Sequence, residues 1–365
     1  MRILVVNAGS SSLKLRAIDE GDELVASHDL AGEYERLDPD DVRAAIEGLG
    51  RVDAVGHRVV HGGIDFVEAV VIDDDVVSRL RALTDLAPLH QPRSLSGIEA
   101  VGAVLTDVTA VACFDTAFHA SLPPAAATYA LPREWRERWP IRRFGFHGLS
   151  HAYASRRAAE LLGRKLEVLR IVTCHLGAVA SLAAVQVGRS ADTTMGFTPL
   201  EGLVMATRSG NVDPGLPLWL QRNGSVSPAD LDEGLEHRSG LLGLAGTSDM
   251  RAVIDRATAG EPDAALALDV YLHRLRAGIA SMAAAMDGLD ALVFTGGVGE
   301  NASVVRERAG AGLAFLGIEL DHALNEGAIG DREIGSVGAT VRTLVVAARE
   351  DLEIARQVRR LLSAG

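Results

Sequence analysis

A turn of small polar residues lies near the start of the chain and could hold a phosphate group. The segment Asn7–Lys14 reads NAGSSSLK and follows the apolar run Ile3–Val6. A tight turn of this composition presents backbone amides, hydroxyl groups and one ammonium group to an anion. Gly and Ser also dominate turns that bind nothing. The segment alone therefore leaves two interpretations open, a phosphate-binding turn and an ordinary one.

A second glycine-rich segment, Phe294–Asn301, reads FTGGVGEN and leads from an apolar run into a helical pattern. A strand that turns directly into a helix lets the backbone approach a nucleotide and directs a helix N-terminus at an anion. The Gly-Lys-Ser/Thr ending of a P-loop is absent, so the lysine and the magnesium ligand of that motif are missing. By itself this segment is a weak indication of nucleotide binding.

Two arginines lie in segments bounded by glycine or proline. Arg58 is in Gly56–Gly63, and Arg208 is in Thr207–Pro214. Phosphoryl transfer spreads negative charge over the equatorial oxygens, and guanidinium groups meet that charge well. A lone arginine is more often at the surface or ion-paired. The two arginines become informative only if other segments supply the remaining parts of such a site.

A carboxylate and several histidines could supply those parts. Asp115 ends the apolar run Val108–Phe114, and Phe144–His151 contains His147 and His151. An imidazole there could donate a hydrogen bond to a transferring phosphoryl group, whereas a helix cap or a buried core histidine is the ordinary alternative.

Two histidine pairs have a spacing of four residues, which would suit zinc if both members lay on a helix. The pairs are His57/His61 and His147/His151. The first pair lies in a predicted strand and the second in a loop broken by Gly148, with no glutamate between either pair and no Cys/His ligand set. The sequence therefore predicts no zinc site.

The segments that position these residues alternate between strand and helix patterns. Apolar runs rich in β-branched residues predict strands at Ile3–Val6, Ala54–Val60, Val108–Phe114, Val168–Thr173, Leu182–Val187, Leu292–Phe294 and Val341–Ala347. Helical periodicity predicts helices at 92–106, 151–163, 263–287, 300–313 and 349–363. This alternation predicts an α/β fold.

One pattern occurs twice along the chain: a strand, a turn of tiny residues and a second strand. It spans Ile3–Leu15 and again Leu169–Val187. The repetition predicts two related lobes, each opening with a hairpin. The last predicted helix follows the final strand of the second lobe, so it could cross back to the first.

Composition narrows the class of protein. The chain has 365 residues, 48% of them hydrophobic and 23% charged, which fits a globular protein of two domains. The net charge of −13, without a basic block, argues against nucleic acid as a partner. Cys113 and Cys174 each lie near the end of an apolar run, so they are predicted to be core thiols in a reducing cytoplasm. Neither a signal peptide nor a membrane span is predicted.

Taken together and in this order, the segments resemble the acetate kinase family. The resemblance covers nearly the whole chain and is most specific in Met195–Met205, which reads MGFTPLEGLVM. The other matching segments are Val5–Lys14, Leu86–His90, Phe114–His119, Phe144–His151, Thr194–Pro214, Gly240–Arg251, Phe294–Asn301 and Glu350–Ala355.

The resemblance implies a fold and an activity. It implies the two-lobed actin-like ATPase fold with a nucleotide cleft between the lobes, an N-terminal lobe of 1–119 plus 353–365 and a C-terminal nucleotide-binding lobe of 120–352. It further implies a homodimer that requires Mg²⁺ (or Mn²⁺) and that transfers a phosphoryl group directly, in line, from ATP to acetate or propionate.

The resemblance also implies residue roles. The catalytic residues would be Arg58, Asp115, His147, Arg208 and His90. The acceptor would be bound by Arg58, Val60, Leu89, Phe146 and Pro199. The nucleotide and its phosphates would be bound by Ser10, Ser12, Lys14, His175, Gly177, Asp249, Arg251, Gly296, Gly297, Gly299 and Asn301. Asn7 and Glu350 would organise the metal. Because a carboxylate acceptor is already ionised near neutral pH, no general base is required, and Asp115 is assigned to positioning or to the metal shell.

The chain departs from the family pattern at a few positions. Ala178-Val179 replaces the usual Asn-Gly, so an amide facing the phosphates is missing, and Val179 would be strained if that turn required a positive φ. The remaining departures are Gln91, Arg93, Asn211 and Arg349.

Several alternatives stay open at the level of sequence. Propionate could replace acetate, and another phosphoryl donor such as pyrophosphate could replace ATP. A nucleotide-switched actin- or chaperone-like protein could use the same fold. A relative that only binds its ligands is the remaining possibility.

Overall fold

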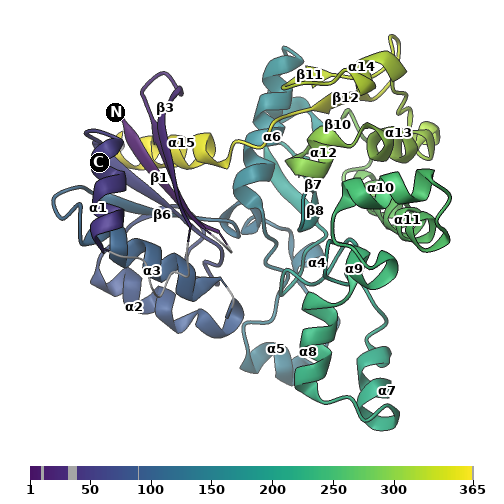
Figure 1. The fold of residues 1–365 in the computed structure, drawn as a ribbon, viewed down its shortest axis with the longest axis horizontal. Helices are drawn as coiled ribbons and strands as arrows, with labels where there is room; N and C mark the ends of the chain where they lie inside the picture. The colour runs from purple at the N-terminus through teal and green to yellow at the C-terminus, as the bar shows by residue number, and fades with distance from the viewer. Residues whose placement is uncertain (10–11, 32–38, 89, 364–365) are drawn as a thin grey trace. The chain divides into compact units, whose positions relative to one another are not determined.

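The computed structural model describes residues 1–9, 12–31, 39–88 and 90–363 (Figure 1). Ser10 and Leu89, two of the predicted site residues, lie outside this range. The chain groups into two compact units, the first made of 1–120, 146–153 and 349–365, the second of 121–145 and 154–348. The segment 146–153 therefore packs with the first unit, whereas the boundaries drawn from sequence place it in the second.

The first unit is built on a six-stranded mixed sheet in the order β3-β2-β1-β4-β6-β5. Strands β1, β4 and β6 are parallel, and the remaining pairings are antiparallel. The strands are β1 Ile3–Ala8, β2 Ser12–Ile18, β3 Leu24–Ala31, β4 Ala54–Val59, β5 Val70–Val71 and β6 Ala110–Phe114. The predicted hairpin at the start of the chain is confirmed as the β1–β2 pair.

Helices cover both faces of this sheet. Successive residues of a strand point to opposite sides, and the apolar side chains on both sides are buried under helices. Leu4 and Val6 of β1 belong to a core cluster that includes side chains of α1 and α3, while Ile3 and Val5 belong to a cluster formed with α15. The helices of the unit are α1 Pro39–Gly48, α2 Asp74–Ala82, α3 Gln91–Gly102 and α15 Glu350–Ser363. The last helix therefore packs against the sheet of the first unit.

Gly56 in β4 explains how closely α15 approaches the sheet. A Cβ atom at this position would lie 2.5 Å from a methyl carbon of Ile354 and 2.8 Å from one of Val358. Only glycine lets these two side chains of α15 rest on the strand backbone. The helix that begins at Glu350 is thus fixed against β4, the strand that carries Arg58.

The second unit repeats the same plan. Its sheet has the order β11-β12-β10-β7-β8-β9, with β7, β10 and β12 parallel and the other pairs antiparallel. The strands are β7 Arg170–Leu176, β8 Ala180–Gln186, β9 Arg189–Thr193, β10 Ala291–Thr295, β11 Arg332–Glu333 and β12 Arg342–Val345. The predicted second hairpin is the β7–β8 pair, and the identical strand order of the two sheets supports two related lobes.

Helices complete the second unit. They are α4 Pro124–Ala127, α5 Arg133–Arg138, α7 Gly215–Asn223, α8 Pro228–His237, α9 Gly240–Ala245, α10 Met250–Thr258, α11 Pro262–Ala284, α12 Gly296–Asn301, α13 Ser303–Ala311 and α14 His322–Glu326. The part of α6 (Gly148–Leu161) that starts at residue 154 also belongs to this unit. The sequence predicts α6, α11 and α13 but none of the other helices of this unit, and it also misses β3 of the first unit, whose side chains are mostly exposed. Among the described residues, no helix is long and apolar enough to span a bilayer.

Candidate active site

The carboxyl ends of three parallel strands bring together three predicted site residues of the first unit. Asn7 is near the end of β1, Arg58 near the end of β4, and Asp115 directly follows β6. Neighbouring parallel strands end at the same edge of a sheet, which is where α/β proteins place their ligands. The sequence predicts the strands, and the sheet order β1-β4-β6 places the residues side by side.

Arg58 is held by hydrogen bonds to two of its neighbours and an ion pair with a third. Its Nη2 donates to Asp115 Oδ2 at 2.6 Å, its Nη1 to Asn7 Oδ1 at 3.3 Å, and its Nε lies 3.7 Å from Glu350 Oε2. Burial acts to lower the pKa of Arg58, but the charges of Asp115 and Glu350 outweigh it, so the pKa lies above its ordinary value. The guanidinium is therefore a fixed, permanent positive charge.

Asp115 is the buried partner of this arginine, with 1% of its surface exposed. Burial raises the pKa of the Asp115 carboxyl, while the charge and hydrogen bonds of Arg58 oppose that rise. Its backbone carbonyl accepts a hydrogen bond from Gly148 N at 2.9 Å, and a Cβ on Gly148 would lie 2.1 Å from that oxygen. The carboxylate orients Arg58, and the carbonyl fixes the loop that carries His147.

His147 has a left-handed backbone conformation, with φ of 55°. Such a conformation is uncommon for a residue other than glycine and is often retained at functional sites, where surrounding contacts impose it. The side chain is largely buried, and its ring centroid lies 6.5 Å from that of His151. The structure thus gives this predicted catalytic histidine a defined position beside Asp115.

Buried histidines surround Phe146, one of the predicted acceptor residues. The His61 ring packs edge-on against it with centroids 5.5 Å apart, and His119 Nε2 lies 3.1 Å from its carbonyl oxygen. Burial lowers the pKa of His61 to about 4 and that of His57 to about 3. Both imidazoles are therefore neutral near pH 7 and add no positive charge to the first unit.

The other predicted residues of this unit lie on nearby segments. Lys14 is directly opposite Asn7 in the β1–β2 hairpin and is exposed, and Ser12 begins β2. Val60 directly follows β4 and is half-buried, as is His90, which precedes α3. Gln91, a departure from the family pattern, is buried and donates to the carbonyls of His61 and Leu80 at 3.3 and 3.1 Å.

The second unit contains a pocket of about 490 Å³ beside the carboxyl ends of β7 and β10. Its volume is typical of a site for a small molecule. Predicted nucleotide-binding residues line it, namely Gly177, Asp249, Arg251, Gly297 and Asn301. The lining residues that the sequence did not predict are Ala206, Leu241, Ser248, Met250, Ile254, Tyr271, Val298, Ala302, Ser303 and Val304. Leu241, Ser248 and Met250 belong to Gly240–Arg251, a segment that resembles the family but in which only Asp249 and Arg251 had been assigned a role.

Three further predicted nucleotide residues do not line this pocket. Gly296 has φ of 79°, and a Cβ there would lie 2.8 Å from the carbonyl oxygen of Leu176, so this glycine is required by close packing of β10 on β7. Gly299 is buried in α12, and His175 lies in β7. Gly296 and Gly299 thus shape the backbone near the pocket without lining it.

The turn that departs from the family pattern is unstrained. Val179 does not have a positive φ, and its carbonyl accepts a hydrogen bond from Gly177 N at 3.1 Å. Ala178 lines the pocket and accepts from Ala206 N at 2.9 Å. Valine is therefore compatible with this turn, and the substantive change is the missing amide side chain at position 178.

Arg208, the second predicted catalytic arginine, is paired with Glu236 at the end of α8. Its Nε donates to Glu236 Oε2 at 2.5 Å. The backbone is fixed as well, because Ser209 N donates to Leu235 O at 3.1 Å and Thr207 Oγ1 to Glu236 O at 2.8 Å. Nothing in the residue pattern indicated this counter-ion.

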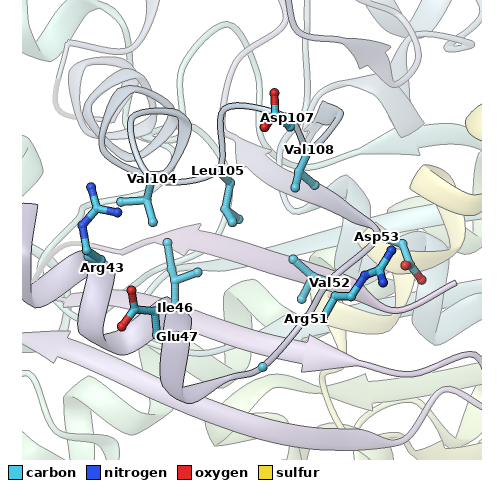
Figure 2. Close-up of a pocket in the computed structure, with 11 residues that line it drawn as sticks. Arg43, Ile46, Glu47, Arg51, Val52, Asp53, Val104, Leu105, Asp107 and Val108 are labelled. Atoms are coloured by element: carbon cyan, nitrogen blue, oxygen red, sulfur yellow. The ribbon is translucent and has the colours of Figure 1, made fainter.

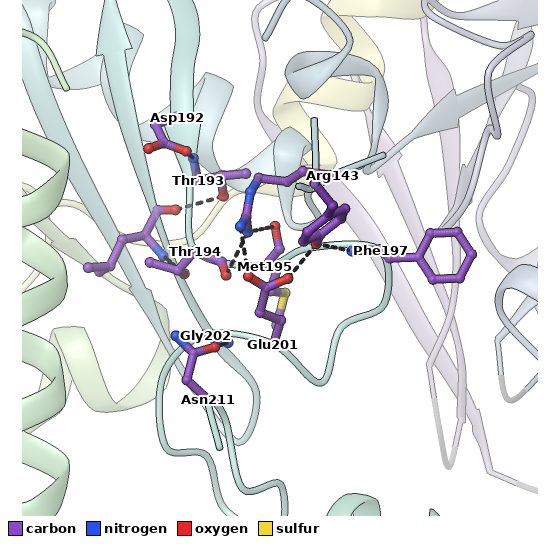
Figure 3. Close-up of polar contacts among 11 residues, drawn as sticks. Arg143, Asp192, Thr193, Thr194, Met195, Phe197, Glu201, Gly202 and Asn211 are labelled. Carbon is purple, nitrogen blue, oxygen red and sulfur yellow. Dashed lines mark hydrogen bonds and ion pairs between the residues drawn. The ribbon is translucent and has the colours of Figure 1, made fainter. Parts of the chain in front are cut away.

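A polar network holds the loop that carries Pro199 (Figure 3). Arg143 Nη2 donates to Glu201 Oε1 at 2.7 Å, and Tyr129 hydrogen-bonds both Glu201 and the backbone of Phe197. Asn211, another departure from the family pattern, accepts from Gly202 N at 2.8 Å and so fixes the end of the loop. Tyr129, Arg143 and Glu201 are site-supporting residues that the sequence analysis missed, because the contacts join distant segments.

A second pocket lies at the amino ends of β4 and β6 in the first unit (Figure 2). It has a volume of about 600 Å³ and contains none of the predicted site residues. Its wall includes Arg43 and Glu47 of α1 and Val104 and Leu105, which follow α3. The carboxyl ends of the same strands carry Arg58 and Asp115, so this pocket is separate from them.

Comparisons with known proteins agree with these arrangements. The profile of the acetokinase family matches residues 36–356. An acetate kinase of Thermotoga maritima is 43% identical over 99% of this chain and 99% of its own length. The crystal structure of Porphyromonas gingivalis acetate kinase superposes with a TM-score of 0.91 at 35% identity, covering 99% of each chain. A propionate kinase of Francisella tularensis superposes with a TM-score of 0.89 at 36% identity, covering 98% of each chain.

These matches confirm the predicted α/β class and the actin-like ATPase fold. They extend over both sheets, the glycine-rich turns and the segments that carry Arg58 and Arg208. The chain therefore belongs to the acetokinase family, whose members use ATP and ADP as co-substrates.

Proposed function

We propose that this protein is an acetate kinase, which reversibly transfers the γ-phosphoryl group of ATP to acetate and forms acetyl phosphate and ADP. The observation that carries the proposal is the Arg58 cluster, in which a permanently charged guanidinium is aligned by the buried carboxylate of Asp115 at the carboxyl edge of the sheet. Acetate is proposed as the acceptor because the chain is similar to acetate kinases.

In this reaction, a carboxylate oxygen of acetate forms a bond to the γ-phosphorus as the bond to the ADP oxygen breaks. Acetate is ionised near neutral pH, so the protein need not remove a proton. Arg58 binds the acetate carboxylate and Arg208 the moving phosphoryl group, because guanidinium groups complement charge that is spread over several oxygens. His147 donates a hydrogen bond to the same group. Asp115 acts through Arg58, whose orientation it sets.

The acceptor's methyl group would contact an apolar surface to which Val60, Phe146 and Pro199 contribute. The pocket on the second unit supports ATP rather than pyrophosphate as the donor, since it offers space for an adenosine beyond the phosphates. Lys14 and Ser12 at the hairpin, together with the backbone near Gly296, would meet the phosphates.

Magnesium fits the residues present. The side-chain oxygens of Asn7 and Glu350 both lie near the Arg58 guanidinium, and hard oxygen ligands of this kind suit Mg²⁺, which keeps several waters and needs few protein ligands. Manganese accepts the same ligands. Within the described part of the chain, no group of three or more His, Cys, Asp or Glu side chains could hold a metal, so these residues would supply one or two ligands. A bound ion would neutralise charge on the phosphate oxygens.

We further propose a homodimer in a reducing cytoplasm. Large apolar side chains are exposed on the second unit, and they are Trp135, Trp139, Leu216, Leu218 and Trp219. Exposed apolar groups of this size often mark a contact with another chain. Both cysteines are buried and unpaired, as in proteins of reducing compartments. Analytical ultracentrifugation would test the dimer, and a monomer at micromolar concentration would contradict it.

A hydroxamate assay tests the function directly. The purified protein is incubated with Mg²⁺, hydroxylamine and either ATP or pyrophosphate, together with acetate, propionate or butyrate. Formation of acetyl hydroxamate that requires ATP supports the proposal. Activity with pyrophosphate alone would contradict the donor, and inactivity with every acid would contradict the enzyme.

Propionate is the second candidate acceptor, favoured by the similarity to a propionate kinase structure. One methylene in an apolar pocket changes discrimination by only about 1–3 kcal/mol, so both acids can be substrates. If Val60 limits the pocket, Val60→Ala shifts the kcat/KM ratio toward propionate.

A further inference from the structure

The turn Phe197–Glu201 is attached at both ends to a single hydroxyl group. The backbone N–H of Phe197 donates to the Tyr129 hydroxyl oxygen at 2.9 Å, and the same hydroxyl donates its proton to Glu201 Oε2 (Figure 3). Pro199 is the middle residue of this turn. The position of Pro199 is therefore set by a residue that lies about seventy positions earlier in the chain and outside the loop.

Arg143 secures the same turn from its other side. Its Nη2 donates to Glu201 Oε1, while its Nη1 donates to the carbonyls of Thr194 and Met195 at 3.2 and 3.1 Å (Figure 3). The Glu201 carboxylate thus uses one oxygen for the tyrosine and the other for the arginine. Charge-assisted bonds of this kind are stronger and more directional than bonds between neutral groups.

The network leaves little room for movement. A Cβ atom at Gly196 would lie 1.7 Å from Glu201 Oε2 and 2.0 Å from the Tyr129 oxygen, so the backbone passes directly against both groups. Burial and the bond to Glu201 raise the pKa of the Tyr129 phenol, which therefore remains protonated and able to donate near neutral pH.

We infer that Tyr129 and Glu201 are positioning residues that determine acceptor size, because they hold Pro199 at the wall of the acceptor site. The inference rests on the proposed function. Discrimination between acids that differ by one methylene depends on a wall that cannot retreat. If the turn is released at either end, Pro199 can withdraw, and a longer acid fits.

The test compares acceptor selectivity in wild-type protein, Tyr129→Phe and Glu201→Gln. Tyr129→Phe keeps the ring and removes both bonds of the hydroxyl, while Glu201→Gln keeps the shape and removes the charge. The expected result is a fall of about fivefold or more in the kcat/KM ratio of acetate to butyrate, within the range that one or two methylenes can produce. The KM for ATP should stay within about twofold, since the turn does not line the nucleotide pocket.

Glu233→Gln is the matched control. Glu233 is exposed on α8, and its replacement is chemically the same as that of Glu201. The Glu233→Gln variant should therefore have the same acetate-to-butyrate ratio of kcat/KM as the wild-type protein. Equal ratios in all four proteins would overturn the inference. A loss of activity toward all acids in equal proportion would also overturn it, because that result indicates a general structural role.

Hydrogen–deuterium exchange separates this inference from the proposed function. Amides of Phe197–Gly202 should exchange at least about tenfold faster in Tyr129→Phe than in wild-type protein if the hydroxyl restrains the turn. Unchanged exchange would overturn the inference even in an active enzyme. Faster exchange in a protein that phosphorylates none of the acids would support the restraint while rejecting the proposed function.

Discussion

Arg208 donates its Nε to the Glu236 carboxylate across a separation of 2.5 Å, and both side chains are largely shielded from solvent. An arginine paired through Nε keeps the two Nη groups for another anion. The pairing therefore orients the guanidinium without using all its donors. The pairing also means that neither the Arg208 guanidinium nor the Glu236 carboxylate is buried without an opposite charge beside it.

Glu236→Gln is expected to lower kcat by about tenfold or more while changing the KM for ATP little, because a mispositioned guanidinium weakens transition-state stabilisation. Steady-state kinetics with acetate measure both parameters, and Glu233→Gln on the same helix is the control. A kcat equal to that of wild-type protein would show that Arg208 is held adequately by its backbone contacts alone.

Arg58→Ala is expected to reduce kcat/KM by at least about a thousandfold, because it removes a charge placed to meet the reacting anion. It should also lower the free energy of unfolding, by about 3 kcal/mol, since it leaves the buried Asp115 carboxylate without its partner. Urea unfolding curves and initial rates would separate the two effects.

The double variant Arg58→Met/Asp115→Asn provides the control for that loss. Removing both charges should recover most of the stability and none of the activity. Recovery of turnover in the double variant would mean that the pair stabilises the fold and takes no part in catalysis.

Acid should destabilise the first unit through its buried histidines. The folded pKa of His61 is about 4, below the value of about 6.5 in an unfolded chain, so the unfolded state binds more protons between these pH values. The free energy of unfolding therefore contains a contribution that is complete above about pH 6.5 and is lost as the pH falls to about 4; its size is on the order of 3 kcal/mol.

His61→Asn tests this contribution, because an amide oxygen can replace Nδ1 as the acceptor for Gly63 N but cannot titrate. The free energy of unfolding of this variant should fall less steeply with acidification than that of wild-type protein. The exposed His28→Asn is the matched control and should follow the wild-type curve. Parallel curves for all three proteins would exclude His61 as the source of the pH dependence.

Ala178→Asn is expected to lower the KM for ATP by several fold and to leave the KM for acetate nearly unchanged, because position 178 lines the pocket of the second unit and an amide there can reach the nucleotide phosphates. Val179→Gly should cost about 0.5–1 kcal/mol of stability without a kinetic gain, since Val179 does not have a positive φ and glycine widens the unfolded ensemble. Kinetics and thermal unfolding of both single variants distinguish these effects. A lower KM for acetate alone would place residue 178 beside the acceptor.

The main strands, the hairpin turns and the chemistry of the site could be predicted from the sequence alone. Apolar runs predicted the strands that end at Asn7, Arg58 and Asp115, and small residues predicted both hairpin turns, because strand periodicity and turn composition are local properties. The family motifs then identified the fold. The sequence showed Gly56 only as a glycine within a predicted strand. It did not show that the missing side chain is what allows α15 to pack against that strand.

The partners and orientations of the site residues became visible only in the folded chain. Sequence carried no sign that Glu236 pairs with Arg208, or that the Tyr129 hydroxyl restrains both ends of the turn around Pro199. The left-handed backbone of His147 was equally hidden, and so was the close contact of the next residue, Gly148, with the Asp115 carbonyl. Such relationships depend on which segments the folded chain brings together, and a local residue pattern does not encode contacts between positions that are distant along the chain.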